Sequence, residues 1–169
     1  MDMRLAYFSA LIFIVLLSCT EEKLKETKKH SNLHVVNVDK SGMAMQKKVY
    51  LPIYGDIYYR DAQHTFSLTV TLSIRNTSFS DSIYIFAIDY YNSQGRKIRR
   101  FNDAAFMVKP MESVEFVVDD KDNSGGVGAN FVVEWGAAQG VQPPFIQGVM
   151  IGTTGQQGIS FTTEGIEIQ

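Results

Sequence analysis

Three oxygen-bearing side chains at alternating positions are the strongest candidates for chemistry in this sequence. They are Asp120, Asp122 and Ser124, in a segment of the form D-x-D-x-S-G that ends at Gly125. Oxygens at the first, third and fifth positions of a calcium loop converge on the ion, and the glycine permits the tight turn. Phe131 stands at the twelfth position, where such a loop needs a bidentate glutamate. We therefore favour an acidic connection between two strands over a calcium site.

Two glycine-rich segments, residues 124–128 and 152–158, are candidate ligand loops. The first lacks the Lys-Ser/Thr of a phosphate loop, and an expected strand follows it, so no helix N-terminus is available to hold an anion. We expect its glycines to adopt positive φ or to pass close to a neighbouring segment. If both loops lie at the same end of the fold, Asn130, Gln156 and Gln157 form a polar ligand site.

No arrangement of a nucleophile and a base is recognisable, and we expect the protein not to be an enzyme. A hydrolase needs a nucleophile with a base within reach. His30 and His34 fall in an expected tether, and His64 falls in an expected turn. The serines and acids show no catalytic spacing.

Composition and charge further narrow the classes of protein and of partner that the sequence allows. Hydrophobic residues make up 45% of the chain, which is enough for a globular core. The formal net charge of -2 gives no basic face to neutralise phosphates, so nucleic acid is not an expected partner. The single cysteine excludes an intrachain disulfide and a cysteine-based metal cluster.

An uncharged apolar run at residues 5–17 follows Arg4. At about 1.5 Å per residue it spans roughly 20 Å as a helix, too short for a hydrocarbon core of about 30 Å. It fits the apolar region of a secretory signal, although Asp2 weakens the positive charge ahead of it. The alternatives are an uncleaved short membrane helix, or a cysteine that only ends an apolar stretch.

The run closes with Leu16-Leu17-Ser18-Cys19, which resembles the lipobox of bacterial lipoproteins. The resemblance implies a signal peptide at residues 1–18, cleavage before Cys19 and diacylglycerol on its thiol, which is the lipid attachment we expect. Two or three acyl chains would hold the protein at a membrane durably. We expect a lipid-anchored protein of the bacterial cell envelope. Thr20, in place of the aspartate associated with inner-membrane retention, favours the outer membrane.

Residues 19–46 are expected to form a flexible tether, because they are polar and lack a sustained apolar period. From residue 47 to 169 the period is two. Apolar and polar residues alternate over 66–74, and apolar residues fill both faces early in 82–91. Turn residues at 92–95 predict a hairpin, and further alternation marks 114–118, 131–135, 145–151 and 159–163. We predict an all-β, antiparallel sandwich of immunoglobulin-like character.

Aromatic and basic clusters lie on these expected strands. Trp135 is expected in the core. Tyr50, Tyr54, Tyr58 and Tyr59 surround Pro52 and Gly55; exposed, they could bind sugar rings or a protein, but we favour partial burial with the hydroxyl at the rim. The basic residues Arg96, Lys97, Arg99 and Arg100 are expected to form a solvated hairpin edge.

The sequence has an expected strand ending in Arg75-Asn76-Thr77, another ending in Asp89-Tyr90-Tyr91, a turn at Gln94-Gly95, and Lys109-Pro110 before a strand over 112–116. This pattern, over residues 72–116, resembles immunoglobulin-like accessory domains of bacterial envelope proteins. More closely, residues 49–168 resemble a family of small bacterial secreted proteins known only as a domain of unknown function. The residues that carry this likeness are LSIRNT at 72–77, DYY at 89–91, SGGVGANF at 124–131, EW at 134–135, VMIG at 149–152 and QQGISF at 156–161. The resemblance implies export and the extent of the fold, and it implies no activity or ligand.

The function expected from these observations is that of a membrane-anchored binding or assembly module that presents loops or a sheet edge to another envelope protein. The alternative is a calcium-dependent or carbohydrate- or solute-binding domain. No cofactor is expected beyond the covalent lipid.

Overall fold

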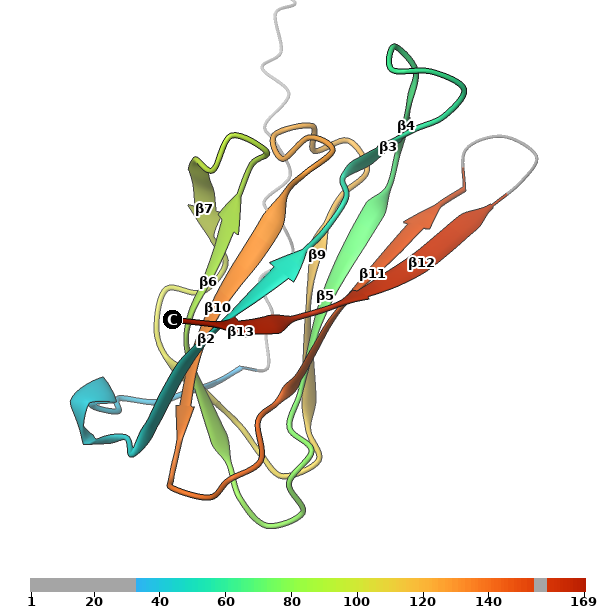
Figure 1. The fold of residues 1–169 in the computed structure, drawn as a ribbon. Coiled ribbons are helices and arrows are strands. Elements are labelled where there is room, and N and C mark those ends of the chain that lie inside the picture. The colour runs from blue at the N-terminus through green and yellow to red at the C-terminus, as the bar shows by residue number, and fades with distance from the viewer. Residues whose placement is uncertain (1–32, 154–157) are drawn as a thin grey trace, which may run out of the picture. The chain divides into compact units, whose positions relative to one another are not determined.

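Residues 33–153 and 158–169 are described by the computed structural model (Figure 1). These residues form strands and one 3-10 turn, η1 (Lys40–Gly42). The strands are β1 (His34–Val35), β2 (Met45–Pro52), β3 (Asp56–Tyr58), β4 (Thr65–Ser67), β5 (Thr69–Arg75), β6 (Ile83–Tyr91), β7 (Lys97–Arg100), β8 (Phe106–Val108), β9 (Ser113–Val118), β10 (Asn130–Ala137), β11 (Phe145–Gly152), β12 (Ile159–Glu164) and β13 (Ile166–Ile168).

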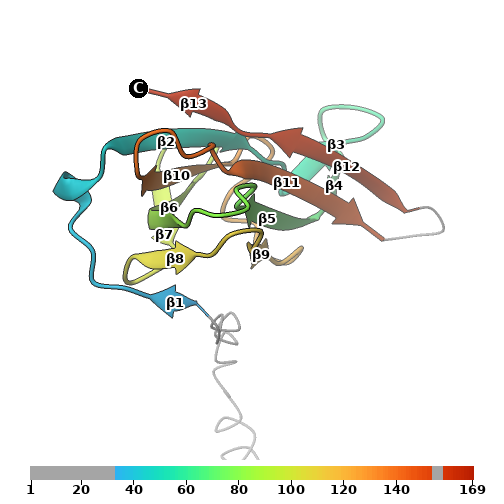
Figure 2. The same ribbon diagram turned by 90° about the horizontal axis from the view of Figure 1, so that it is seen from below.

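The strands form two packed antiparallel sheets and one separate hairpin (Figures 1 and 2). The larger sheet has the order β1-β8-β6-β10-β2-β13, with β7 paired to the far end of β6. The smaller sheet has the order β12-β11-β5-β9, and β3 pairs only with β4. The predicted all-β antiparallel sandwich is confirmed. β1 and the start of β2 lie inside the segment 19–46, and residues 20–32 lie outside the described part of the chain.

The strand order is that of an immunoglobulin sandwich in which the first and last strands along the chain have exchanged sheets. In the immunoglobulin arrangement the first strand pairs with the second in one sheet, and the last strand pairs with the sixth in the other. Here the early strand β2 lies against β10, and the late strand β11 lies against β5. The strands from the two ends of the chain have therefore changed sheets.

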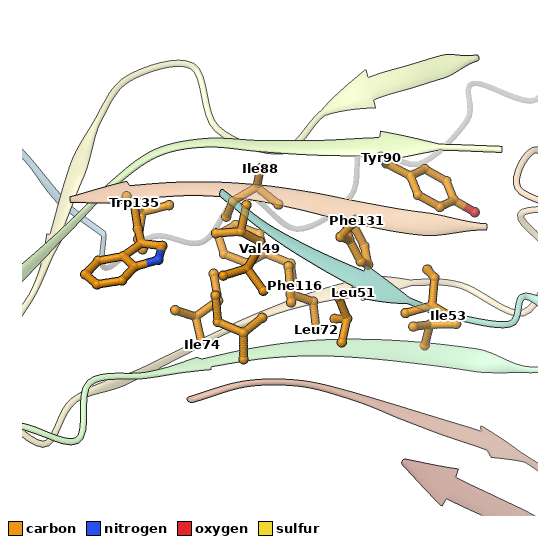
Figure 3. Close-up of a cluster of buried hydrophobic side chains, with 14 of the residues drawn as sticks. Val49, Leu51, Ile53, Leu72, Ile74, Ile88, Tyr90, Phe116, Phe131 and Trp135 are labelled. Atoms are coloured by element: carbon orange, nitrogen blue, oxygen red, sulfur yellow. The ribbon is translucent and has the colours of Figure 1, made fainter. Parts of the chain in front are cut away.

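The core lies between the sheets and follows the alternation of the sequence. On β5, Val70, Leu72 and Ile74 are fully buried. Figure 3 shows Leu72 and Ile74 pointing toward strands of the opposite sheet. Figure 3 shows the cluster with Trp135 at one end and Tyr90 at the other. Trp135 is 1% exposed, so its predicted place in the core is confirmed. The labelled members are Val49, Leu51, Ile53, Leu72, Ile74, Ile88, Tyr90, Phe116, Phe131 and Trp135.

One side of the sandwich is closed by a chain segment that changes sheet at a glycine. β12 pairs with β11 in the smaller sheet, whereas β13 pairs with β2 in the larger one. Gly165 joins them, and a Cβ on this residue would lie 2.4 Å from the Val49 side chain. Only glycine passes this corner without displacing the core. Figure 2 shows β13 running on from β12 and lying beside β2.

None of the helical segments within residues 33–153 and 158–169 has the length and apolar character needed to span a bilayer.

A buried asparagine fills a gap along the edge of β6. Along this edge the strand pairs with β8 at residues 83–85 and with β7 at residues 89–91, so the middle of the edge has no neighbouring strand. The Asn102 side chain bridges that gap, because its Oδ1 accepts from the Ile88 amide at 2.8 Å and its Nδ2 donates to the Phe86 carbonyl at 3.1 Å. Nδ2 also donates to the Ala104 carbonyl. The side chain therefore replaces part of a missing strand.

Replacing this side chain should destabilise the domain. Asn102→Ala leaves the buried Ile88 amide and Phe86 carbonyl without their partner, and we expect a loss of about 1 to 3 kcal/mol in the free energy of unfolding. Urea denaturation followed by tryptophan fluorescence measures it. Asp103→Ala, at the exposed neighbouring position, is the control and should leave the midpoint nearly unchanged. Equal midpoints for the two variants would contradict the bridging role.

Candidate functional site

The connection between β9 and β10, residues 119–129, is held by a salt bridge to β7. The Asp122 Oδ2 lies 2.8 Å from Nη2 of Arg99. The other carboxylate oxygen, Oδ1, accepts hydrogen bonds from the backbone amide and the hydroxyl of Ser124. Burial raises the pKa of Asp122, but the hydrogen bonds from Ser124 and the charge of Arg99 outweigh it, so this pKa lies below its usual value.

Of the three candidate calcium ligands, only Asp122 contacts Arg99. Asp122 and Ser124 bind each other, and Asp120 is exposed. Within residues 33–153 and 158–169, no three His, Cys, Asp or Glu side chains are grouped to hold a metal ion. A calcium ion at Asp122 would have to displace the Arg99 guanidinium, which supplies the positive charge there.

Arg99 departs from the solvated edge predicted for its basic segment. Its guanidinium carbon lies 4.7 Å from the centroid of the Phe101 ring and 5.4 Å from that of the Tyr90 ring, so it stacks against core aromatics. Lys97 and Arg100 instead reach the outer face of the larger sheet, where both pair with Asp89. The hydrogen bond from Arg100 lowers the pKa of Asp89. Arg99 and Arg100 are neighbours and turn to opposite faces because of the period of two. A register irregularity between Tyr90 and Tyr91 in the β6–β7 pairing puts Lys97 on the same face as Arg100.

The Tyr90 hydroxyl is buried directly beneath the loop. Tyr90 is fully buried, and a Cβ on Gly125 would lie within van der Waals overlap of its hydroxyl. Burial raises the pKa of Tyr90, and the Asp122 carboxylate adds to that effect. Ser124 lowers this pKa slightly, but no partner within the described residues forms a hydrogen bond of good geometry with the Tyr90 hydroxyl. The Tyr90 ring therefore limits how closely the loop at Gly125 can approach the core.

The glycines of the loop do what the sequence predicts. Gly126 has a φ of +73°. The Ser93 hydroxyl donates to the Gly125 carbonyl and accepts from the Gly128 amide, which ties the loop to the β6–β7 turn. The glycines thus permit both the positive φ and the close approach, as expected.

The predicted ligand residues are only partly placed. Asn130 is the first residue of β10 and is paired with Pro52 on one side and Tyr91 on the other. Gln156 and Gln157 lie outside the described residues, so the polar site formed with Asn130 stays a prediction.

A projecting hairpin, β3–β4, lies between the β9–β10 connection and the end of β11. Gly55, just before β3, would bring a Cβ within 3.5 Å of the Gly126 carbonyl. On the other side, a Cβ on Gly152 would overlap the ring of Phe66 in β4. Ile57 and Phe66 pack one face of the hairpin against the core. Figure 1 shows the hairpin protruding at the upper end of the sandwich.

Tyrosines on this hairpin are more exposed than the sequence indicates. Tyr54 is 38% exposed, Tyr58 57% and Tyr59 43%. They are exposed because three-residue strands leave little sheet to cover their rings, although Tyr54 meets Phe161 and Tyr59 meets His64 edge-on. Tyr50, on the long strand β2, keeps the partial burial we expected. His64 lies in the turn region before β4, as predicted, and its Nδ1 contacts the Asp61 carboxylate at 2.7 Å. The sequence signal for this surface was the clustering of tyrosines around Gly55.

Comparison with known proteins places the domain in a family. The family model of DUF3124, described as a protein of unknown function, matches residues 46–168. The chain belongs to the DUF3124 family. The crystal structure of Thermotoga maritima 1070 is similar at 15% identity, covering 71% of this chain and 92% of its own, with a TM-score of 0.40; so distant a likeness carries no argument. No curated protein matches the chain.

Removing the charge of Asp122 should loosen the loop end of this DUF3124 domain. Asp122→Asn leaves Arg99 without its counter-charge, and we expect a loss of about 1 to 2 kcal/mol in the free energy of unfolding, since the arginine stays partly solvated. Asp120→Asn, two residues away and exposed, is the matched control and should cost little.

The pH dependence provides a second measure of the same pair. Because the pKa of Asp122 is lower in the folded state than the ordinary 3.8, its contribution is present above that value and is lost as the pH falls through the folded-state pKa. Urea unfolding at neutral and acid pH should show the difference between wild type and Asp122→Asn shrinking on acidification. A constant difference at all pH values would exclude the ionised pair as its source.

Proposed function

We propose that this chain is a lipid-anchored protein of the bacterial cell envelope, and that its DUF3124 domain is a non-enzymatic binding or assembly module. Support for the anchor comes from the sequence, in the apolar run at residues 5–17 and the lipobox-like Leu16-Leu17-Ser18-Cys19. Residues 20–32 then separate the lipid from the first described strand. The outer membrane and another envelope protein remain the proposed location and partner.

The observation that carries the binding role is the composition of the β3–β4 hairpin. Protein interfaces are enriched in tyrosine and arginine and depleted of lysine and glutamate. Residues 53–68 contain Tyr54, Tyr58, Tyr59 and Arg60 and neither lysine nor glutamate. All four of these side chains are exposed. The two aspartates of the segment, Asp56 and Asp61, are bound within the hairpin by Ser67 and His64. A surface of this kind suits contact with a protein better than it suits solvent.

Arg60 strengthens the case because its backbone is strained. Its φ is +66°, a region that glycine enters freely and that costs other residues about 1 kcal/mol or more. The guanidinium carbon lies 5.7 Å from the centroid of the Tyr59 ring. No ion pair of Arg60 occurs within the described ranges, 33–153 and 158–169. The strained turn thus holds a cation and an aromatic ring together at the tip, ready to meet an acidic or aromatic partner surface.

The binding role is tested by photocrosslinking in intact cells. Gln63, at the exposed turn of the hairpin, is replaced by a photoreactive residue. We expect one defined adduct with an envelope protein, and we expect Tyr58→Ser with Tyr59→Ser to abolish it, because both ring contacts are lost. Ile166→Ser, an exposed apolar residue on β13, is the control and should leave the adduct intact. Only nonspecific adducts, unchanged by the tyrosine substitutions, would refute the proposal.

The anchor is tested at the cysteine. We expect mass spectrometry of the native protein to show an N-terminal Cys19 carrying acyl chains, and Cys19→Ala to leave the membrane fraction, because no other lipid attachment site is available on a thiol. Recovery of an unmodified N-terminus at Met1 in the soluble cytoplasmic fraction would show that the anchor proposal is wrong.

A further inference from the structure

We propose that the end of the sandwich opposite the β3–β4 hairpin makes a second, non-covalent contact with a lipid surface, through Phe79 and Met111. The inference rests on the proposed lipid anchor and adds an orientation to it. The contact surface is formed by the β5–β6 loop, residues 76–82, and the β8–β9 turn, residues 109–112; we call these two segments the apolar tip. Figure 1 shows the β5–β6 loop at the lower end of the sandwich and the hairpin at the upper end.

Two large apolar side chains stand in solvent on the apolar tip. Phe79 is 86% exposed and Met111 is 58% exposed, and Phe79 is the most exposed of the large hydrophobic side chains described. The two segments are in contact, because the Met111 amide donates to the Ser78 carbonyl at 3.1 Å. Exposed apolar residues gathered on loop ends are typical of surfaces that enter another apolar phase.

Hydrogen bonds from one buried side chain hold the two segments of the apolar tip together. Asn76 is 2% exposed, and its Nδ2 lies 2.7 to 3.1 Å from the carbonyls of Asp81, Val108 and Lys109. Its Oδ1 accepts from the Ser78 amide. One buried side chain therefore fastens both segments to each other and fixes the loop that carries Phe79. The conformational entropy of this loop is already lost on folding, so binding does not have to pay for ordering it.

Met111 occupies a position that normally favours glycine. The Glu112 amide donates to the Lys109 carbonyl, and Pro110 and Met111 form the centre of this turn. Met111 has a φ of +58°, which is costly for a side chain with a Cβ. A glycine would relax the turn but would remove the apolar side chain beside Phe79. A strained position that holds an exposed methionine points to a role for that side chain outside the fold.

The chain enters the domain at this same end, which selects a lipid surface as the occupant. β1 follows the proposed tether, its His34 is paired with Met107 of β8, and the His34 Nε2 contacts Glu112 of the β8–β9 turn at 3.3 Å. Residues 20–32 reach at most about 45 Å when extended, so a lipid on Cys19 keeps the apolar tip near a bilayer. The nearest apolar phase for Phe79 and Met111 is then the membrane.

The apolar tip carries charges of both signs. Asp81 accepts hydrogen bonds from Ser78 and Ser80, and Glu112 accepts one from the Lys109 amide, so both acids are engaged within the protein. Arg75 and Lys109 are exposed and form no ion pair with any residue that the structure describes. The carboxylate charges of Asp81 and Glu112 offset those of Arg75 and Lys109, so the two apolar side chains, and not a net positive charge, drive the contact, while the two cations can reach lipid phosphates. Insertion of two side chains is weak alone, but it becomes effective when the anchor already holds the domain at the membrane.

The test uses a reporter on the full lipidated protein. Cys19 is the sequence's only cysteine and is acylated in the proposed mature form, so a newly introduced cysteine provides the only free thiol. Thr77→Cys places an environment-sensitive fluorophore on the apolar tip, and Gln63→Cys places it on the β3–β4 hairpin as the matched control; both positions are exposed. The proteins are reconstituted in vesicles of phosphatidylcholine and phosphatidylglycerol, with or without a quencher attached to the lipid.

We expect the fluorophore at position 77 to emit at shorter wavelength and to be quenched several-fold more strongly than the one at position 63. Phe79→Ser with Met111→Ser should return position 77 toward the control, because losing two buried apolar side chains lowers the partition by about tenfold or more. Unchanged thermal melting of this variant shows that the fold is kept.

Other outcomes overturn the inference at separate points. Equal quenching at positions 63 and 77 on protein that floats with the vesicles refutes the apolar tip and leaves the anchor standing. Shielding of position 77 in native envelopes but not in pure lipid vesicles replaces the lipid with a protein partner. Failure of the wild-type protein to float refutes the anchor of the proposed function, and with it the inference.

Discussion

The fold depends on how backbone groups are satisfied where its β-ladders stop. A sandwich of short strands has many such points, and an unpaired buried amide or carbonyl costs free energy. Three buried asparagines occupy three of them. Asn76 caps the end of β5, Asn92 accepts from the Gln94 and Arg96 amides beyond β6, and Asn102 spans the gap between β7 and β8. An asparagine suits each place because its amide offers donors and an acceptor from a short side chain. These contacts fix the loops on which the candidate surfaces are built.

The long strands could be predicted from the sequence because alternation over many residues is a strong signal. Residues 66–74 and 131–135 show the period of two, and their apolar members are the ones found in the core. The hairpin of β3 and β4 could not be predicted in the same way, since three residues are too few to establish a period. Its tyrosines were recognisable as a cluster, but their exposure depends on how little of the sheet extends around them.

The candidate surfaces differ in how far they could be anticipated. Nothing in the sequence around Phe79 shows that Asn76 fixes the loop that holds this ring in solvent. The partner of Asp122 was equally hidden, because Arg99 comes from a different hairpin and its inward direction depends on register. The proposed anchor is the reverse case. A lipobox is a linear signal read by an enzyme, so it is visible in the sequence and needs no fold around it.

The shortness of β1 has a mechanical consequence under the proposed lipid anchor at the N-terminus. Tension along the chain reaches β1 first, and this strand is only His34–Val35, paired on one side. β2 follows, with eight residues held between β10 and β13. A modest pull would therefore peel away residues 33–44 and lengthen the mooring by about 40 Å at full extension, before the sandwich itself bears the load. The domain would then stay close to the bilayer without load and lie farther from it once tension has pulled out residues 33–44.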